Sequence, residues 1–304
     1  MADIGATTWN ENDDDNDVAA PNGAPEGMAP SGVNNVLRAH QGAVKRFWDR
    51  INPVKTTGGS GSAYTLTYDV PATSYYDGEV HSFVAGATCA AGATLNITGL
   101  GAVPLRMFGG AVLAGAILAG QVVQVRYKQS AGAFDLIVPG GWVRLGEQTP
   151  SVASSVAFAG IPSGVKHLSL DGEITVSNSS ASLVARTAGP DGNIDSGGSD
   201  YTFLIMSPEG AGATVPVATG SASGWVLAGP VDNVTYGASA GLKINNIQAA
   251  KRKVARWEGA WRTGGSAAVM RMGTGTRVAD EAITGLELSV TAGTMTGAFT
   301  LFAS

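Results

Sequence analysis

The sequence is short of cysteine, histidine and charge, and each shortage excludes a class of protein. Charged residues make up 14% of the 304 residues, and the chain holds one cysteine and three histidines. The single cysteine, Cys89, cannot form a disulfide within the chain, so we expect a fold held by packing, with Cys89 as a small buried apolar residue. None of the histidines (His40, His81 and His167) neighbours a G-x-S-x-G phrase, which the sequence lacks, so we expect no nucleophilic triad. We place His81 and His167 on strand surfaces.

Long apolar runs are also missing. The longest candidate, residues 107–120, covers 14 positions and includes four glycines, whereas a membrane-spanning helix needs about 20 apolar residues. The alternation in the following "QVVQVRY" favours two strands around a Gly/Ala turn, so we expect no membrane insertion. The opening "MADIGATTWN" lacks the basic and apolar regions of a secretory signal, which predicts synthesis in a cytoplasm.

The net charge of −5 is too small for a general attraction to nucleic acid, and we expect no nucleic-acid partner. The charge is unevenly distributed, because residues 1–30 hold seven acidic side chains and no basic one. Residues 31–52 carry a net positive charge, so the two segments can attract each other or neighbouring subunits. The run Asp13, Asp14 and Asp15 is typical of a solvated or arginine-docking segment rather than a metal site.

Small residues are abundant, with 43 glycines among the 304 residues. This composition favours a mainly β fold with many turns. The patterns along the chain predict six segments: an extended arm at 1–30, an amphipathic helix at 31–52, a flexible linker at 53–63, a β module at 64–140, a connector at 141–150 and a second β module at 151–304.

The arm is too polar to fold alone. Trp9 and Met28 are its large apolar residues, which is too little burial to offset the entropy of ordering, so we expect the arm to order on a partner. The residues that we expect to make this attachment are Trp9, Asp13, Asp14, Asp15, Pro25, Met28 and Pro30.

The helix carries an apolar stripe. We expect Ser31 to cap its start and Pro53 to stop it. Its apolar residues recur at steps of three and four, and each is worth about 1.5 to 3 kcal/mol when buried. The cheapest cover is the same helix from other copies of the chain; a socket on a larger assembly and the chain's own β module are the alternatives. The predicted trimer interface is Val33, Val36, Leu37, His40, Val44, Phe47, Trp48 and Ile51.

The rest of the chain alternates between apolar and polar residues in short runs. Six such runs lie between residues 64 and 140 and predict a compact antiparallel unit. Ten more lie between 151 and 304 and predict a jelly-roll-like sandwich with the C-terminal strand paired inside a sheet.

One basic and aromatic cluster, "KRKVARWEGAWR", is a candidate ligand platform through Arg256, Trp257 and Trp261. Such a cluster can bind nucleic acid or an anionic glycan by charge pairing and stacking. In a strand, however, the two tryptophans share one face, which favours a role in the core or between subunits. Carboxylates for a glycan depolymerase are available, but the sequence does not show which of them pair.

A metal site is not expected. In "DGNIDSGGSD", Asp191, Asn193 and Asp195 match the first ligand positions of a calcium loop. Ser196 then stands where the turn glycine belongs and Thr202 where the bidentate glutamate belongs, which favours an ordinary hairpin loop.

The phrase "PEGMAPSGVN" followed by a helix ending in "KRFWD" resembles the N-terminal segment of bacteriophage tail-fibre and related virion appendage proteins. The section from "LNITGLGA" to "FDLI" is similar to the β module that follows in those proteins, and "GIPSGVK" with a final "GAFTLF" is similar to their C-terminal module. Together these sections cover most of the chain, and the N-terminal phrase is the most specific. Asn35 stands where an acidic residue is common in the family.

The resemblance implies a homotrimeric structural component of a phage virion, a tail fibre, spike or adaptor subunit. Its N-terminus would attach to the particle, and its β modules would project toward the host. We therefore expect no enzymatic activity and no cofactor, with other copies of the chain, other phage structural proteins and a host cell-surface glycan as partners. A glycan-binding receptor protein, a glycan depolymerase and a head fibre or decoration protein stay open as alternatives.

Overall fold

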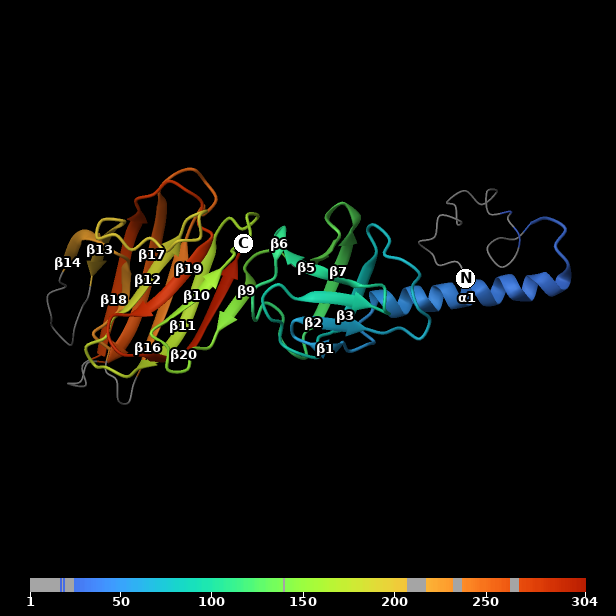
Figure 1. Ribbon diagram of the computed structural model, residues 1–304, viewed down its shortest axis with the longest axis horizontal. Helices are drawn as coiled ribbons and strands as arrows, with labels where there is room; N and C mark the ends of the chain where they lie inside the picture. The colour runs from blue at the N-terminus through green and yellow to red at the C-terminus, as the bar shows by residue number, and fades with distance from the viewer. Residues whose placement is uncertain are drawn as a thin grey trace. The chain divides into compact units, whose positions relative to one another are not determined.

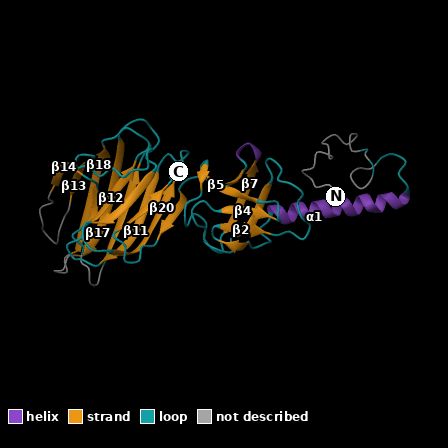
Figure 2. Ribbon diagram, viewed as in Figure 1, coloured by secondary structure: helices purple, strands orange, loops and turns teal. Residues whose placement is uncertain are grey.

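The computed structural model describes residues 17, 19, 25–138, 140–206, 217–231, 237–262 and 268–304. These residues form a mainly β protein with one α-helix ahead of the strands, as expected (Figures 1 and 2). The chain divides into two compact units. The helix unit comprises residues 1–88, 93–105 and 117–137, and the sandwich unit comprises residues 89–92, 106–116 and 138–304.

Helix α1 spans Pro30–Ile51. Proline suits the first turn of a helix, where its missing N–H would have no partner. The cap residue is Ala29, which offers no side-chain hydrogen bond, so the prediction of a Ser31 cap is wrong by two positions. At the other end, the backbone N–H and the side-chain amide of Asn52 both donate to the Trp48 carbonyl, at 3.1 and 2.9 Å. The stop before Pro53 is as predicted.

The first sheet contains all six strands predicted between residues 64 and 140, and two short ones besides. Among the described residues the order is β1-β2-β4-β5-β8-β7-β3, with β6 paired to β5. The strands are β1 (Gly58–Ser60), β2 (Ala63–Leu66), β3 (Val80–Val84), β4 (Thr94–Ile97), β5 (Ala102–Met107), β6 (Gly110–Ala111), β7 (Val122–Lys128) and β8 (Ala133–Leu136). Strands β2 and β4 run parallel, so the prediction of a wholly antiparallel unit is wrong. After β2 the chain crosses to β3, at the far edge of the sheet, and then returns to form β4 beside β2. Because this connection crosses the sheet and is not a hairpin, β4 can run parallel to β2.

The first sheet curls until its two edges approach each other. Thr56, just before β1, bridges to Val84 of β3, and the Thr57 N–H donates to the Val84 carbonyl at 2.9 Å. Strand β1 itself pairs with β2. The predicted flexible linker at 53–63 is therefore largely part of the sheet. Gly59 lies within β1, where its φ is +81°, and a Cβ there would lie 2.1 Å from the Ala63 carbonyl oxygen, so glycine is required for this close approach of the two strands.

The core of the helix unit contains a polar side chain that the sequence had placed on the surface. His81 is 1% exposed. Its Nδ1 lies 3.1 Å from the Tyr68 hydroxyl, and Phe134 packs edge-on against its ring, with 5.8 Å between the centroids. Strand β3 is covered on both faces because the sheet curls around one face and α1 packs on the strand. The prediction of a surface His81 is wrong for this reason.

The sandwich unit consists of two antiparallel sheets in the described residues. One has the order β10-β19-β12-β15, and the other β14-β13-β18-β17-β16-β11-β20-β9. The C-terminal strand β20 lies between β11 and β9, as predicted. The strands are β9 (Val143–Gln148), β10 (Ser155–Ala159), β11 (Leu168–Val176), β12 (Leu183–Ala188), β13 (Tyr201–Met206), β14 (Val217–Ala222), β15 (Trp225–Ala228), β16 (Ala238–Ile244), β17 (Lys253–Arg262), β18 (Ala268–Arg277), β19 (Gly285–Val290) and β20 (Met295–Ala303).

The structure of the sandwich unit differs from the prediction in two details. Residues 141–150 are not a plain connector, because β9 pairs with β20 there. In a jelly roll most successive strands alternate between the sheets, whereas β16, β17 and β18 are consecutive neighbours in one sheet. The ten strands predicted from residue 151 onward are all present, and β14 is an addition to them.

Buried side chains from both sheets form the sandwich core. Trp225 of β15 packs against Trp257 of β17, with ring centroids 6.2 Å apart. Tyr201 meets Trp225 edge-on at 4.9 Å.

Cys89 is buried as predicted, and its thiol donates to the Leu113 carbonyl at 3.2 Å.

Candidate functional site

The predicted interface residues of α1 form an exposed apolar seam. Val33, Leu37, Val44, Phe47 and Trp48 are between 46% and 59% exposed. His40 is exposed and Ile51 is half-buried. Val36 is the exception, because it is buried at 6% exposure. Most of the predicted stripe is therefore open to a partner.

The exposed residues follow a heptad pattern. Residues 33, 37, 40, 44, 47 and 51 alternate in steps of four and three, which is the a/d spacing of a coiled coil. We number this seam with Leu37, Val44 and Ile51 at a and with Val33, His40 and Phe47 at d. The buried residues Val36, Ala43 and Arg50 repeat every seven positions and all fall at g. The helix thus covers its g flank within the chain and leaves the a/d seam open.

A buried ion pair fixes the C-terminal end of α1 on the sheet. Arg50 Nη1 lies 3.1 Å from Glu79 Oε1, and both side chains are largely buried. The guanidinium also lies over the Tyr68 ring, 5.9 Å from its centroid. Burial alone would raise the pKa of the Glu79 carboxyl, but the neighbouring His81 and Arg50 outweigh it and hold the pKa below its ordinary value. The orientation of the helix on its own sheet is therefore specified.

A pocket lies beside the seam, where α1 meets the sheet. Its volume is about 550 Å³, and its lining includes Ala43, Phe47, Arg50, Tyr76, Arg126 and Ile137. We call it the helix-side pocket. Ile137 is 39% exposed, so the apolar surface continues from the helix onto the sheet. Cavities of this size hold large side chains or drug-sized ligands.

The predicted attachment residues are only partly within the described structure. Trp9, Asp13, Asp14 and Asp15 lie outside the described residues. Pro25, Met28 and Pro30 are described, and they precede or begin α1. Pro25 and Met28 are half-buried, and Pro30 is exposed.

The second candidate site is a trough on the outer face of the larger sheet in the sandwich unit. Five adjacent strands, β11, β16, β17, β18 and β13, contribute to a cavity of about 470 Å³. We define the outer-face trough by its charged and apolar side chains and one glycine: Asp171, Gly241, Lys243, Arg256, Glu258 and Met272. Only one of these, Arg256, belongs to the predicted platform.

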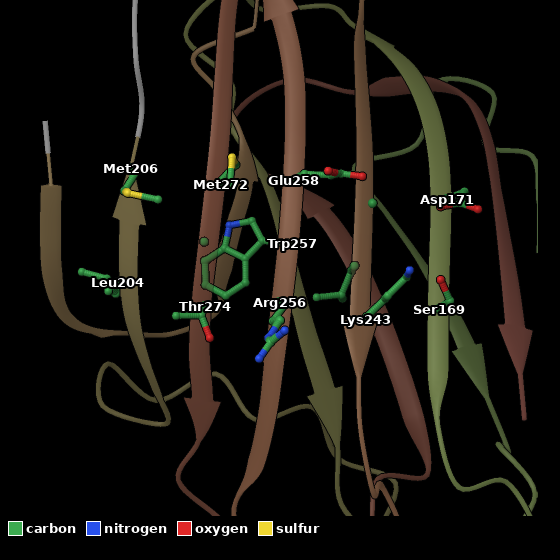
Figure 3. A pocket seen from close by; sticks show the side chains of 13 residues that line it. Ser169, Asp171, Leu204, Met206, Lys243, Arg256, Trp257, Glu258, Met272 and Thr274 are labelled. Carbon is green, nitrogen blue, oxygen red and sulfur yellow. The ribbon is translucent and has the colours of Figure 1, made fainter. Parts of the chain in front are cut away.

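Strand register brings these residues together from distant parts of the chain. Lys243 of β16 stands directly opposite Arg256 of β17. One step along, Gly241 lies opposite both Asp171 of β11 and Glu258 of β17. Because Gly241 has no side chain, it leaves a notch between the two carboxylates. Figure 3 shows Glu258 reaching from β17 toward β16 at this point.

The notch lies within reach of both acids. A Cβ built on Gly241 would be 3.6 Å from the nearest Glu258 oxygen and 3.7 Å from the nearest Asp171 oxygen. The two oxygens are therefore no farther apart than the sum of these distances. A hydroxyl or ammonium group above Gly241 could bond to both carboxylates at once.

The predicted tryptophan platform is wrong as a surface feature. Trp257 and Trp261 are 4% and 5% exposed, because the inward face of β17 carries both rings. Neither indole offers an open face to a ligand. Arg256 points to the opposite face and is exposed, as strand alternation requires. The preference for a core role of the two tryptophans is confirmed.

The calcium-like loop is held by its own contacts. Asp191 accepts hydrogen bonds from the backbone and the side-chain amide of Asn193, at 3.0 and 2.7 Å. Asp195 accepts from the buried Arg277 guanidinium. No group of three His, Cys, Asp or Glu side chains suited to a metal ion occurs among the residues that the structure describes. Over the same residues, no helix has the length and apolarity to cross a membrane.

Comparison with known proteins finds no protein-family model that matches the chain and no curated protein that matches it.

Proposed function

We propose that the chain is a structural subunit of a phage particle, a homotrimeric fibre, spike or adaptor component that attaches through its N-terminal segment. The observation that carries the proposal is the a/d seam of α1, which is largely exposed within the part of one chain that the structure describes. The resemblance of the "PEGMAPSGVN" segment to virion appendage proteins supports the attachment end. The acidic composition of residues 1–30 suits docking on a basic surface of another structural protein.

The seam is the apolar centre of the proposed contact between copies. Its five most exposed apolar residues offer on the order of 500 Å² per chain, so a trimer buries roughly 1,500 Å², divided among three pairwise contacts of about 500 Å² each. A standard specific interface buries about 1,600 Å² per pair, so the remaining area would come from surfaces outside the seam. The seam carries β-branched residues at d (Val33) and at a (Val44 and Ile51), so its composition does not by itself select two strands or three. The homotrimer is therefore proposed from the family resemblance. His40 at a d position would set the register of the helices at a small cost in stability.

The helix-side pocket supports a parallel arrangement. In parallel coiled coils, a g residue lies beside the e residue of the following heptad in the neighbouring helix. Here Ala43 is at g and Trp48 is at the following e position, so the indole of one chain would lie at Ala43 of the next. Ala43 is 1% exposed in the single chain and lies in the wall of the helix-side pocket, and Trp48 is 57% exposed. The indole of the neighbouring chain would therefore enter the pocket beside Ala43 without displacing the cover that the chain's own sheet gives to this residue.

The test is the mass of the full chain in solution, by sedimentation equilibrium over a wide range of dilution. We expect a trimer for the parent chain and a monomer for Leu37→Asp, which places a charge at an a position. Asn35→Asp is the matched control, because it adds the same side chain to the exposed f position of α1. A stable monomer of the parent chain at micromolar concentration would contradict the proposal.

Attachment has its own test. A chain that lacks residues 1–30 should still form the trimer but should not join phage particles. Immunoblotting of purified particles against the free trimer pool measures this directly. Incorporation of the shortened chain at the parent level would show that the arm is not the attachment segment.

A further inference from the structure

We propose that the outer-face trough of the sandwich unit binds a polysaccharide that carries uronic-acid residues, with Lys243 and Arg256 on the sugar carboxylate and with Asp171 and Glu258 on its hydroxyls. This inference goes beyond the structural role proposed above. It depends only on residues within the sandwich unit, so it holds or fails independently of the trimer.

The four charged side chains of the outer-face trough have no internal partner within the described part of the chain. Lys243, Arg256, Asp171 and Glu258 are all exposed, and within the described part of the chain none of their side chains makes a hydrogen bond or an ion pair. Elsewhere in the same unit, acids and bases do pair, as in Arg186 with Glu287 at 3.2 Å. The trough charges are therefore available to a ligand.

The arrangement of the two cations of the trough costs the fold stability. Lys243 and Arg256 stand directly opposite each other on neighbouring antiparallel strands, and like charges in that position are destabilising. An arrangement chosen for the fold alone would place an acid opposite a base. Two adjacent cations instead form a site for one carboxylate, since Arg presents a planar fork and Lys a point charge.

The spacing of the two charge pairs matches one sugar residue. Arg256 and Glu258 lie two residues apart along β17, and Lys243 and Gly241, which faces Asp171 of β11, lie two residues apart along β16; two residues of a strand correspond to roughly 7 Å. A pyranose ring has similar dimensions, so one uronic-acid residue can place its carboxylate at Arg256 while its hydroxyls donate to Glu258 and Asp171. A free anion would use the cations but would gain nothing from the two acids.

The trough also has an apolar wall and room for more than one sugar. Met272, Leu204 and Met206 line the cavity on the side of β18 and β13 and are between 40% and 44% exposed. They can pack against the C–H face of a ring. A second cavity of about 300 Å³ shares Asp171, Gly241 and Glu258 with the first. The continuous surface favours a chain of sugars over a single one.

Nucleic acid is a poor alternative occupant. Its backbone would bring a phosphate charge to every nucleotide, and the two carboxylates at the notch would repel it. Stacking on aromatic rings is also missing here, because Trp257 and Trp261 are turned into the core. A polymer with anionic and hydroxyl groups in each unit fits both charge pairs.

The experiment is calorimetric titration of the full chain with three probes: an oligosaccharide of glucuronic acid, its methyl ester, and a neutral oligosaccharide of glucose of the same length. We expect binding of the acid, and at least about tenfold weaker binding of the ester and of the neutral probe, because charged hydrogen bonds to the cations are lost. Equal binding of all three probes, or binding of none, would overturn the proposal.

The variants divide the site into its two halves. Lys243→Gln with Arg256→Gln should abolish the preference for the acid over its ester. Gly241→Leu should fill the notch and weaken all binding at least about tenfold. Lys251→Gln with Arg252→Gln is the matched control, because it removes the same two charges from exposed residues outside the trough.

Circular dichroism and sedimentation of each variant confirm that it is folded and keeps the parent mass. If the control pair weakens binding as much as the trough pair, the attraction is general rather than local and the proposal is wrong. A parent chain that is monomeric but binds the acid as described would refute the trimer and leave the trough proposal intact.

Discussion

The indole of Trp48 gives the sharpest test of the proposed trimer. Its side chain is 57% exposed in the single chain, which corresponds to about 140 Å² of a tryptophan that presents roughly 250 Å². At ~25 cal/mol per Å², burial of this surface is worth about 3.5 kcal/mol per chain. Association converts only part of such an area into affinity, so we take that value as an upper limit.

The perturbation is Trp48→Ala, measured by sedimentation equilibrium of the full chain. We expect the trimer to weaken by at least about a hundredfold, since 1.4 kcal/mol corresponds to a factor of ten and each trimer loses three indoles. Trp142→Ala is the matched control. Trp142 is 50% exposed but lies outside α1, so its removal should leave the trimer unchanged. A Trp48→Ala trimer as tight as the parent would refute the assignment of the seam.

The proposed contact between Trp48 of one chain and the helix-side pocket at Ala43 of the next is tested by a double-mutant cycle. Ala43→Leu alone should weaken the trimer because the larger side chain fills the pocket that receives the neighbouring indole. Since Ala43 is 1% exposed, urea unfolding of this variant separates the effect from overpacking within the chain. With Trp48→Ala, the leucine fills the empty space, so the double variant should be more stable than the two single effects added together. We expect a coupling of about 0.5–3 kcal/mol, as found for residues in contact. Purely additive effects would show that Trp48 and Ala43 do not meet.

Three further predictions concern the fold. Arg50→Met should destabilise the helix unit by about 3–5 kcal/mol because it leaves the buried Glu79 carboxylate without the guanidinium that lies 3.1 Å from it; urea unfolding should show a smaller loss when Glu79→Gln is added. Burial raises the pKa of Tyr201 to about 12 from 10.0, so the folded chain keeps the phenolic proton while the unfolded chain releases it. Tyr201 should therefore contribute a fall in stability of roughly 2–3 kcal/mol between about pH 10 and pH 12. Burial also raises the pKa of Tyr68 and of Tyr75, so Tyr201→Phe should show a smaller slope in urea unfolding but not a flat profile. Gly273→Ala should cost about 1–3 kcal/mol, because its Cβ would lie 2.1 Å from an indole ring, whereas Gly198→Ala meets nothing within 4 Å and should be neutral by the same assay.

Local patterns predicted the elements whose signals are contained in a few neighbouring residues. The proline at the start of α1 and the one after its end bracket the helix to within one or two residues. Alternation in "KVARWEGAWR" predicted both the strand and the inward face of Trp257 and Trp261. In each case the period of the side chains decides the structure without reference to distant residues.

Features that depend on distant partners were missed. The segment Gly58–Ser60 has the composition of a flexible linker, yet it forms β1 because β2 begins three residues farther on and Gly59 permits the close approach of the two strands. Residues 143–148 form β9 because the last strand of the chain pairs with them. His81 is buried because a helix and a curled sheet cover its strand on both sides. Composition cannot report any of these contacts.

The outer-face trough shows why a site of this kind escapes motif reasoning. Asp171, Lys243 and Glu258 come from strands β11, β16 and β17, and about 70 residues of chain separate Asp171 from Lys243. Antiparallel register, not sequence spacing, places them within two residues of one another across the sheet. Sequence alone can therefore offer carboxylates and cations as candidates, but only pairing of the strands turns them into one charged notch around Gly241. The exposed seam of α1 is the opposite case, because every residue in it is three or four positions from the next.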